Sequence, residues 1–492
     1  MRKLLAKGNT LFLVSLIEYG APLLRMLALS HLLTLRELGF ASALTATYTA
    51  FEQITDFSIY RFVLSAPRER YDEALASAHA LSIMRGAAVG AIAALCAPLA
   101  ARAFSLSAEW PEFALLGAVA LLRSFEHLGP RVAERDYSYG AQFKTSVVAN
   151  GAALAVLLIG LLTGAGHRAV LASLLTQAAA QALASRCFAA DPYRINWRSK
   201  MVRDGFNFGY PLMINGFGLA ASFQGDRFVV GALLGLPELG IYAIVTLAAL
   251  LPLNMLGRIV GAVLLAALCN APNADAYRAR VKLSTRGVAL LAALYGVGVL
   301  LFLNIVTPWV FGAKFTLSEA SVAILSVGVF LRLVRGEPFT SMLLHSGRTR
   351  RLTSSNLASS SALGFEFILL SIFRNFESLM TGRLLGEIVA LFVSLRVTRE
   401  EFRDARRDFL VSIFGAMGLL AGAIVLSHVF RLEASLPLSI AVFSSAVSIC
   451  AIWALYFAPP LVRVAFPDAR HWAARPLTLP RFRRSPISLK QD

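Results

Sequence analysis

Residues 287–303 read GVALLAALYGVGVLLFL and contain no charged side chain. This stretch forms the centre of a longer, mostly apolar run at 284–311. The hydrocarbon core of a bilayer is about 30 Å thick, and a helix needs about 20 mostly apolar residues to cross it. The run therefore predicts a transmembrane helix, and similar runs recur along most of the chain.

Fourteen such runs can be counted, and the links between them are short. They predict an all-α polytopic membrane protein with about 14 transmembrane helices. There is no room between the runs for a soluble domain of any size. The runs lie at 9–33, 40–64, 77–105, 110–130, 141–163, 168–190, 205–233, 240–268, 284–311, 318–344, 356–373, 378–396, 409–430 and 436–459.

The composition excludes an ordinary soluble enzyme. Of the 492 residues, 57% are hydrophobic and 15% are charged, whereas an average soluble domain has roughly 25% charged residues. The net charge of +18 could suit nucleic acid, but the basic residues are spread between apolar runs. This spread favours cytoplasmic loops that face anionic lipid, so we expect no nucleic-acid partner. The four cysteines and seven histidines show no metal-ligand spacing, and we expect no metal or cofactor.

The distribution of lysine and arginine predicts the orientation. If the N-terminus is cytoplasmic, 33 basic residues fall in inside segments and 6 in outside links. Because positive residues concentrate on the cytoplasmic side, both termini are expected there, and the number of helices should be even. The basic stretch Met1–Thr10 precedes a run that is too long for a cleavable signal peptide, so the first helix is expected to stay in the membrane.

A short motif occurs twice, at an offset of 201 residues. LRELGF at 35–40 links the first two runs, and LPELGI at 236–241 links the seventh and eighth. Glycine suits a tight turn between two helices, and equivalent positions in two six-helix blocks indicate an internal repeat. We therefore predict two pseudo-symmetric six-helix lobes, two extra helices and a basic cytoplasmic tail. Their predicted bounds are 1–200, 201–400, 401–460 and 461–492.

Together with GDRFVVG at 225–231, the two motifs and the two-lobe plan resemble the polysaccharide flippases. These are the O-antigen and exopolysaccharide flippases of the multidrug/oligosaccharidyl-lipid/polysaccharide exporter superfamily. The resemblance covers roughly residues 1–400. It implies a transporter, not an enzyme, that moves polyprenyl-pyrophosphate-linked oligosaccharide across the inner membrane by alternating access. Its partners would be the lipid-linked substrate, membrane lipids, and a polysaccharide polymerase with other assembly proteins.

Two other functions stay open. One is a cation-coupled multidrug exporter of the same superfamily, whose cavity should be acidic or apolar. The other is a membrane enzyme such as an O-antigen polymerase or ligase, which usually carries reactive groups on a large external loop. The sequence contains no HExxH, GxxxxGK[ST] or GxSxG motif, so we expect no ATP hydrolysis by this chain.

Eight arginines fall inside apolar runs, where each costs at least about 2.5–3.5 kcal/mol unless it faces water or a partner. Arginine suits phosphate because its planar fork stays charged and donates paired hydrogen bonds. We predict that six of them line a cationic cavity between the lobes and contact the pyrophosphate. We expect the double change Arg332→Ala and Arg335→Ala to block surface polysaccharide while the protein still inserts. The six are Arg25, Arg61, Arg227, Arg258, Arg332 and Arg335.

Other interpretations of these arginines stay open. Arg61 and Arg258 lie near the inner surface, where a long side chain can extend to water. Arg383 and Glu387 are spaced i, i+4 and could neutralise each other.

Four acidic residues are candidates for ion coupling. Glu52 and Asp56 are spaced i, i+4, and two close carboxylates in a low dielectric cannot both ionise easily, which favours proton binding. Asp226 and Glu366 are the other two candidates. Alternatively, each carboxylate pairs with an arginine, and Asp226 with Arg227 could form a structural ion pair with a neighbouring helix.

Overall fold

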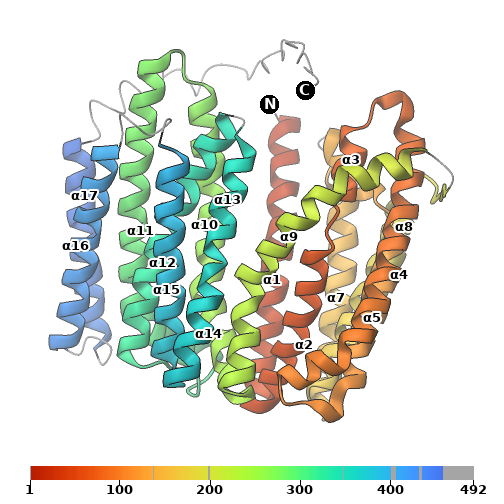
Figure 1. The fold of residues 1–492 in the computed structure, drawn as a ribbon, viewed down its shortest axis with the longest axis horizontal. Coiled ribbons are helices and arrows are strands. Elements are labelled where there is room, and N and C mark those ends of the chain that lie inside the picture. The colour runs from red at the N-terminus through yellow and green to blue at the C-terminus, as the bar shows by residue number, and fades with distance from the viewer. Residues whose placement is uncertain are drawn as a thin grey trace.

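The computed structural model is a bundle of long helices that run side by side (Figure 1). Within the described residues every regular element is a helix and no strand occurs, so the predicted all-α fold is confirmed. Each of the fourteen predicted runs lies on one helix or on two consecutive helices. The predicted tail at 461–492 lies outside the described residues. The structure describes residues 2–136, 138–197, 200–346, 348–399, 406–430 and 435–457.

The first lobe consists of six long helices and the short helices between them. Helix α4 packs along α5, α7 along α8, and α1 against α7. The long helices are α1 (Arg2–Leu32), α2 (Leu35–Ile54), α4 (Tyr71–Ala103), α5 (Trp110–Ser124), α7 (Gly140–Leu162) and α8 (Arg168–Phe188). The short ones are α3 (Ile59–Ser65), α6 (Gly129–Val132) and the 3-10 helices η1 (Arg68–Arg70), η2 (Ser107–Glu109) and η3 (Ala133–Asp136).

The second lobe repeats this plan, and the last two helices pack on its α11 at the edge of the bundle (Figure 1). The domain boundaries stay a prediction, because the long helix α9 contacts α2 and α4 of the first lobe as well as α10 and α14. The helices are α9 (Lys200–Leu233), α10 (Leu236–Cys269), α11 (Ala274–Phe311), α12 (Glu319–His345), α13 (Thr349–Ser359), α14 (Ser361–Phe373), α15 (Phe376–Val397), α16 (Arg406–Phe430) and α17 (Leu436–Phe457).

The predicted run at 40–64 is interrupted after Ile54, where α2 ends. The side chain of Asp56 accepts a hydrogen bond from the backbone N–H of Ser58 at 2.8 Å, and Ser58 has a left-handed backbone with φ of 47°. This turn separates α2 from the short α3. Hydropathy could not predict the break, because the turn lies between two apolar segments.

The two copies of the repeated motif pack directly against each other. A Cβ atom on Gly39 would lie 1.8 Å from the carbonyl oxygen of Leu236, and one on Gly240 would lie 2.7 Å from the carbonyl oxygen of Leu35. The contacts are reciprocal, since each pair is related by the same offset of 201 residues. The helix bounds show the same offset. The ends of α1 and α9 are 201 residues apart, and so are the starts of α2 and α10. Glycine is therefore required at both positions by the close approach of α2 and α10.

The same end of the bundle carries a second link between the lobes. Nε2 of His31, in the last turn of α1, lies 2.9 Å from the carbonyl oxygen of Val310 near the end of α11. In return, Nζ of Lys314, just after α11, donates to the carbonyl oxygen of Leu33 just after α1, at 2.8 Å. The carbonyls at a helix C-terminus lack partners within the helix and attract cations, so these bonds join α1 to α11.

In the described part of the chain, seven helical segments are long and apolar enough to cross a membrane by length and composition. Several other helices at predicted runs carry polar side chains. Helix α8 contains Gln177 and Gln181, and α12 contains Arg332 and Arg335. These polar residues line the cavities described next.

Candidate functional site

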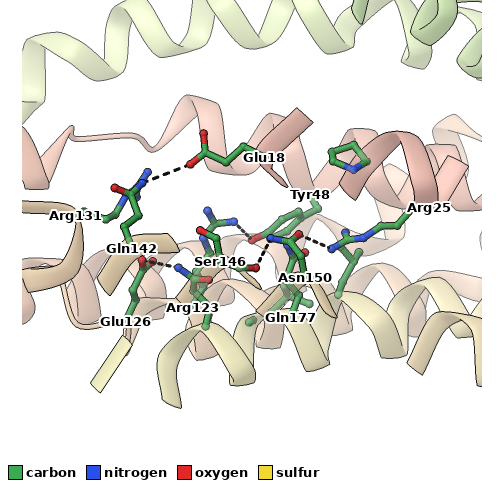
Figure 2. A pocket seen from close by; sticks show the side chains of 15 residues that line it. Glu18, Arg25, Tyr48, Arg123, Glu126, Arg131, Gln142, Ser146, Asn150 and Gln177 are labelled. Atoms are coloured by element: carbon green, nitrogen blue, oxygen red, sulfur yellow. Dashed lines mark hydrogen bonds between the residues drawn. The ribbon is translucent and has the colours of Figure 1, made fainter. Parts of the chain in front are cut away.

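Two adjoining cavities lie inside the first lobe, with volumes of about 300 Å³ and 200 Å³. Three residues line both of them, namely Arg123, Glu126 and Arg131. We call the two together the first-lobe chamber. Figure 2 shows the larger cavity, into which polar side chains from α1, α2, α5, α7 and α8 converge. Its lining residues are Glu18, Pro22, Arg25, Tyr48, Val119, Arg123, Glu126, Arg131, Gln142, Ser146, Asn150, Leu174, Gln177, Ala178 and Gln181.

A polar stripe on two apolar helices forms one wall of the chamber. Gln142, Ser146 and Asn150 are spaced four residues apart on α7, and Gln177 and Gln181 have the same spacing on α8. Residues four apart lie on one face of a helix, so this spacing directs the side chains to one side. The Gln177 amide donates to Oδ1 of Asn150 at 3.0 Å and thereby joins the two helices.

Arg25 enters the chamber from α1 (Figure 2). Its Nη2 donates to Oδ1 of Asn150 at 3.2 Å. Its Nε is buried and has no hydrogen-bond partner among the residues that the structure describes. A buried guanidinium donor without an acceptor carries a desolvation cost that a bound anion would remove.

Two further arginines line both cavities. Arg123, in the last turn of α5, donates from Nη1 to the hydroxyl of Tyr48 at 3.2 Å. Arg131, on the short α6, lies over the ring of Tyr60 at 5.2 Å from its centroid. In the described part of the chain, neither of them nor Arg25 forms an ion pair with a carboxylate. Their guanidinium groups therefore face the cavities without a direct salt bridge, although Glu52 and Glu126 line the same space.

Arg85, a fourth arginine at the chamber, is paired. Its Nη2 donates to Oε2 of Glu52 at 3.1 Å and to the backbone oxygen of the same residue at 3.0 Å. Because α2 ends at Ile54, Glu52 and Asp56 do not share a helix face as expected, although both line the smaller cavity. The alternative interpretation, in which Glu52 pairs with an arginine, describes the structure.

Two carboxylates of the larger cavity accept hydrogen bonds from amides. Gln181 donates to Oε1 of Glu126 at 2.9 Å, and Gln142 donates to Oε1 of Glu18 at 3.5 Å. The link that carries Glu126 is held by His127, whose Nδ1 lies 2.9 Å from the backbone N of Gly129. Burial lowers the pKa of His127, so the ring stays neutral and Nδ1 can accept this bond.

The second lobe contains a different arrangement, which we call the second-lobe cluster: Asp226, Tyr242, Arg332, Arg335, Glu366, Arg383 and Glu387. Arg383 on α15 binds the carboxylate of Asp226 on α9 and donates to the Tyr242 hydroxyl at 2.7 Å. The Tyr242 hydroxyl donates to Asp226 at 2.5 Å. Asp226 thus pairs with Arg383 on α15, and the salt bridge expected between Arg383 and Glu387 does not form among the described residues.

The remaining arginines of the cluster also have partners. Arg335 donates from Nε to Oε2 of Glu387 at 2.9 Å. The guanidinium carbon of Arg332 lies 5.0 Å from the centroid of the Phe223 ring. The cavity beside them is small, about 70 Å³, so there is little room for a ligand.

Glu366 on α14 lines the same small cavity and is only 1% exposed. Its Oε2 has no hydrogen-bond partner among the described residues. Its main chain packs against α15, since a Cβ on Gly382 would lie 2.5 Å from the Glu366 nitrogen. Glu366 and Asp226 therefore line one site, whereas Glu52 and Asp56 line the other lobe.

The other predicted arginines lie outside the cavities described above. Arg61 on α3 is exposed and donates to the Tyr60 hydroxyl at 3.1 Å. Arg227 donates to the side chain of Gln224 at 3.2 Å. Arg258 on α10 is exposed. The structure thus divides the six predicted arginines, with Arg25 in the first-lobe chamber and Arg332 and Arg335 in the second-lobe cluster.

These residues do not form the single cationic cavity that was expected between the lobes. The chamber lies within the first lobe, and its arginines Arg25, Arg85, Arg123 and Arg131 equal its carboxylates in number. The carboxylates are Glu18, Glu52, Asp56 and Glu126. Among the described residues, no group of three histidine, cysteine or acidic side chains could hold a metal ion.

Sequence reasoning missed most of the chamber. The count of basic residues places Arg123 and Arg131 in an inside segment at 123–144, whereas the structure places them on α5 and α6, at the chamber. The amides were not considered at all. Their four-residue spacing inside apolar runs was a usable signal, because a polar stripe on an apolar helix needs polar partners.

The sequence matches the family described as "Polysaccharide biosynthesis protein" over residues 28–320. The chain belongs to this family. The match covers more than half of the chain and agrees with the resemblance to polysaccharide flippases. A search of curated proteins found no match.

Solved structures with a similar fold are transporters of the MOP superfamily. An inward-facing MATE-family multidrug resistance transporter is similar with a TM-score of 0.63 and 13% identity, over 79% of this chain and 95% of that one. The lipid II flippase MurJ, in an inward closed conformation, is similar with a TM-score of 0.61 and 13% identity, over 89% of this chain and 98% of that one. A MATE structure in a bent conformation has a TM-score of 0.55. The family member thus has the polytopic membrane fold of these transporters.

Proposed function

We propose that the protein is a flippase that translocates polyprenyl-pyrophosphate-linked oligosaccharide across the inner membrane for surface polysaccharide biosynthesis. Its family is one of polysaccharide biosynthesis, and its fold is shared with a lipid II flippase and with multidrug transporters. On this proposal the chain is not an enzyme. Its partners are the lipid-linked substrate, membrane lipids, and a polymerase with other assembly proteins.

The observation that carries the proposal is the set of arginines in the first-lobe chamber that form no direct salt bridge with a described carboxylate. Arg25, Arg123 and Arg131 line a polar cavity of about 300 Å³. A guanidinium can donate two parallel hydrogen bonds to a phosphate, and such charge-assisted bonds are stronger than neutral ones. The pyrophosphate would bind these groups, while the polyprenyl chain stays in lipid.

The two-lobe fold supports translocation by alternating access. The lobes are joined at the end of the bundle that carries the α1–α2 link, through Gly39, Gly240, His31 and Lys314. On the predicted topology this end faces away from the cytoplasm, and both termini are cytoplasmic. Opening there while the opposite end closes would release the substrate in the outer leaflet.

A multidrug exporter with cationic substrates is less well supported. Three arginines, Arg25, Arg123 and Arg131, line the larger cavity and would repel a cation placed beside them. Among the described residues, two carboxylates line the larger cavity, Glu18 and Glu126. Its arginines therefore outnumber its acids.

The proposal is tested with the purified full chain in proteoliposomes that contain a fluorescent polyprenyl-pyrophosphate oligosaccharide. Wild type should expose the inner-leaflet lipid to an external reagent, and Arg25→Gln or Arg123→Gln should slow this by about tenfold or more, as expected when a charged hydrogen bond is lost. Arg102→Gln is the matched control, because Arg102 is exposed in the last turn of α4.

Two outcomes would contradict the proposal. One is no translocation by a correctly folded wild-type protein. The other is transport of a cationic dye in place of the lipid, which would favour the exporter.

A further inference from the structure

The carboxylates of the first-lobe chamber restrict the kind of glycan that can enter it. Glu126 is only 6% exposed and accepts its hydrogen bond from Gln181, and Glu18 accepts one from Gln142. Both carboxyl groups line the space that the substrate would occupy, where they would repel a second anion.

The charges of the empty chamber already balance, with four arginines and four carboxylates around the two cavities. A pyrophosphate adds negative charge, for which Arg25, Arg123 and Arg131 are the cations without a direct salt bridge to a described carboxylate. No arginine at the chamber is then left to neutralise an acidic sugar. A further anion would face Glu18 and Glu126, and like charges brought together at a site repel each other.

The polar wall of the chamber suits an uncharged sugar. The side chains of Gln142, Asn150, Gln177 and Gln181 each have amide donors and a carbonyl acceptor. A sugar hydroxyl is also both donor and acceptor, so such a wall can bind it in several orientations. Figure 2 shows this wall between Arg25 at one end of the cavity and Arg131 at the other. A glycan along the wall would lie beside the arginines that bind the pyrophosphate.

We infer that the first-lobe chamber selects lipid-linked glycans whose sugars nearest the pyrophosphate are uncharged, and that Glu18 and Glu126 exclude acidic sugars. The inference rests on the proposed flippase function and adds the substrate class. The two glutamates act as specificity-determining residues. The amides of α7 and α8 bind the sugar hydroxyls.

The test compares two probes on the detergent-purified full chain. One is a polyprenyl pyrophosphate with a single N-acetylated neutral hexose, and the other is the same lipid with a hexuronic acid. Wild type should bind the neutral probe at least about tenfold more tightly, because of the like-charge repulsion. In the double variant Glu18→Gln and Glu126→Gln the ratio of the two affinities should fall to about threefold or less. Glu69→Gln, an exposed acid on η1, is the control and should keep the wild-type ratio.

The outcomes separate this inference from the proposed function. Equal affinity of wild type for both probes, or tighter binding of the acidic one, overturns the inference and leaves the flippase proposal standing. Failure of both probes to bind a folded wild-type protein overturns both. If the double variant does not fold, Glu18→Gln alone serves, since Glu18 is exposed in the structure. An unchanged ratio in a folded glutamate variant removes the role of the substituted glutamate.

Discussion

The first-lobe chamber and the second-lobe cluster occupy comparable places in the two halves of the molecule, yet their arginines have different partners. In the chamber Arg25 bonds an amide and Arg123 bonds a tyrosine, beside cavities of about 300 Å³ and 200 Å³. In the cluster Arg335 and Arg383 bond carboxylates, beside a cavity of about 70 Å³. In the first lobe Arg25 and Arg123 face cavities from neutral partners, whereas in the second lobe Arg335 and Arg383 are paired with Glu387 and Asp226.

The internal repeat makes this difference informative. Asp226 stands 201 residues after Arg25, which is the offset that relates α1 to α9. Arg123 lies 13 residues after the start of α5, and Arg332 lies 13 residues after the start of α12. The equivalent positions of Arg25 and Asp226 thus carry opposite charges, whereas those of Arg123 and Arg332 carry the same charge. The backbone plan alone does not determine which lobe can bind an anion.

The largest expected effect comes from breaking the second-lobe cluster. Arg383→Met leaves Asp226 buried without its cation, and removal of one partner of a buried pair costs about 3–5 kcal/mol. Unfolding of the detergent-purified variant by heat or denaturant should show a loss of this size. Arg25→Met is the matched control, and its stability should stay unchanged or rise, because no carboxylate depends on Arg25. Equal losses in both variants would remove the distinction between the lobes.

The contact that unites the lobes should give the next largest effect. Gly39→Ala places a Cβ 1.8 Å from the carbonyl oxygen of Leu236, so the helices must move apart. Forcing extra atoms into a packed site costs about 1–3 kcal/mol. Gly151→Ala on α7 is the control, since nothing lies within 4 Å of a Cβ there. We expect thermal unfolding to show a loss for Gly39→Ala only, and a stable variant would contradict the close contact.

Hydropathy was enough to predict the helices but not their partners. Every apolar run lies on a helix, because crossing a bilayer requires a long apolar segment. The ion pair between Asp226 and Arg383 joins residues 157 positions apart, and no local spacing predicts such a pair. Arg25 was identified because it lies deep in an apolar run, whereas Arg123 was missed because it lies at a helix end and was counted with a loop.

The smallest expected effect concerns the link that carries Glu126 into the chamber. His127→Ala removes the acceptor of the Gly129 N–H, and the loss of one hydrogen bond costs about 1 kcal/mol. Thermal unfolding of the detergent-purified variant should show a loss of this size, and unchanged stability would contradict the role of His127 in the link.

The most direct test of the account is to locate the bound pyrophosphate by cryo-electron microscopy of the full chain with a polyprenyl-pyrophosphate-linked sugar. We predict phosphate density in the first-lobe chamber, within hydrogen-bond distance of Arg25, Arg123 or Arg131. Density against Arg332 and Arg335 in the second lobe, with the first-lobe chamber empty, would contradict it.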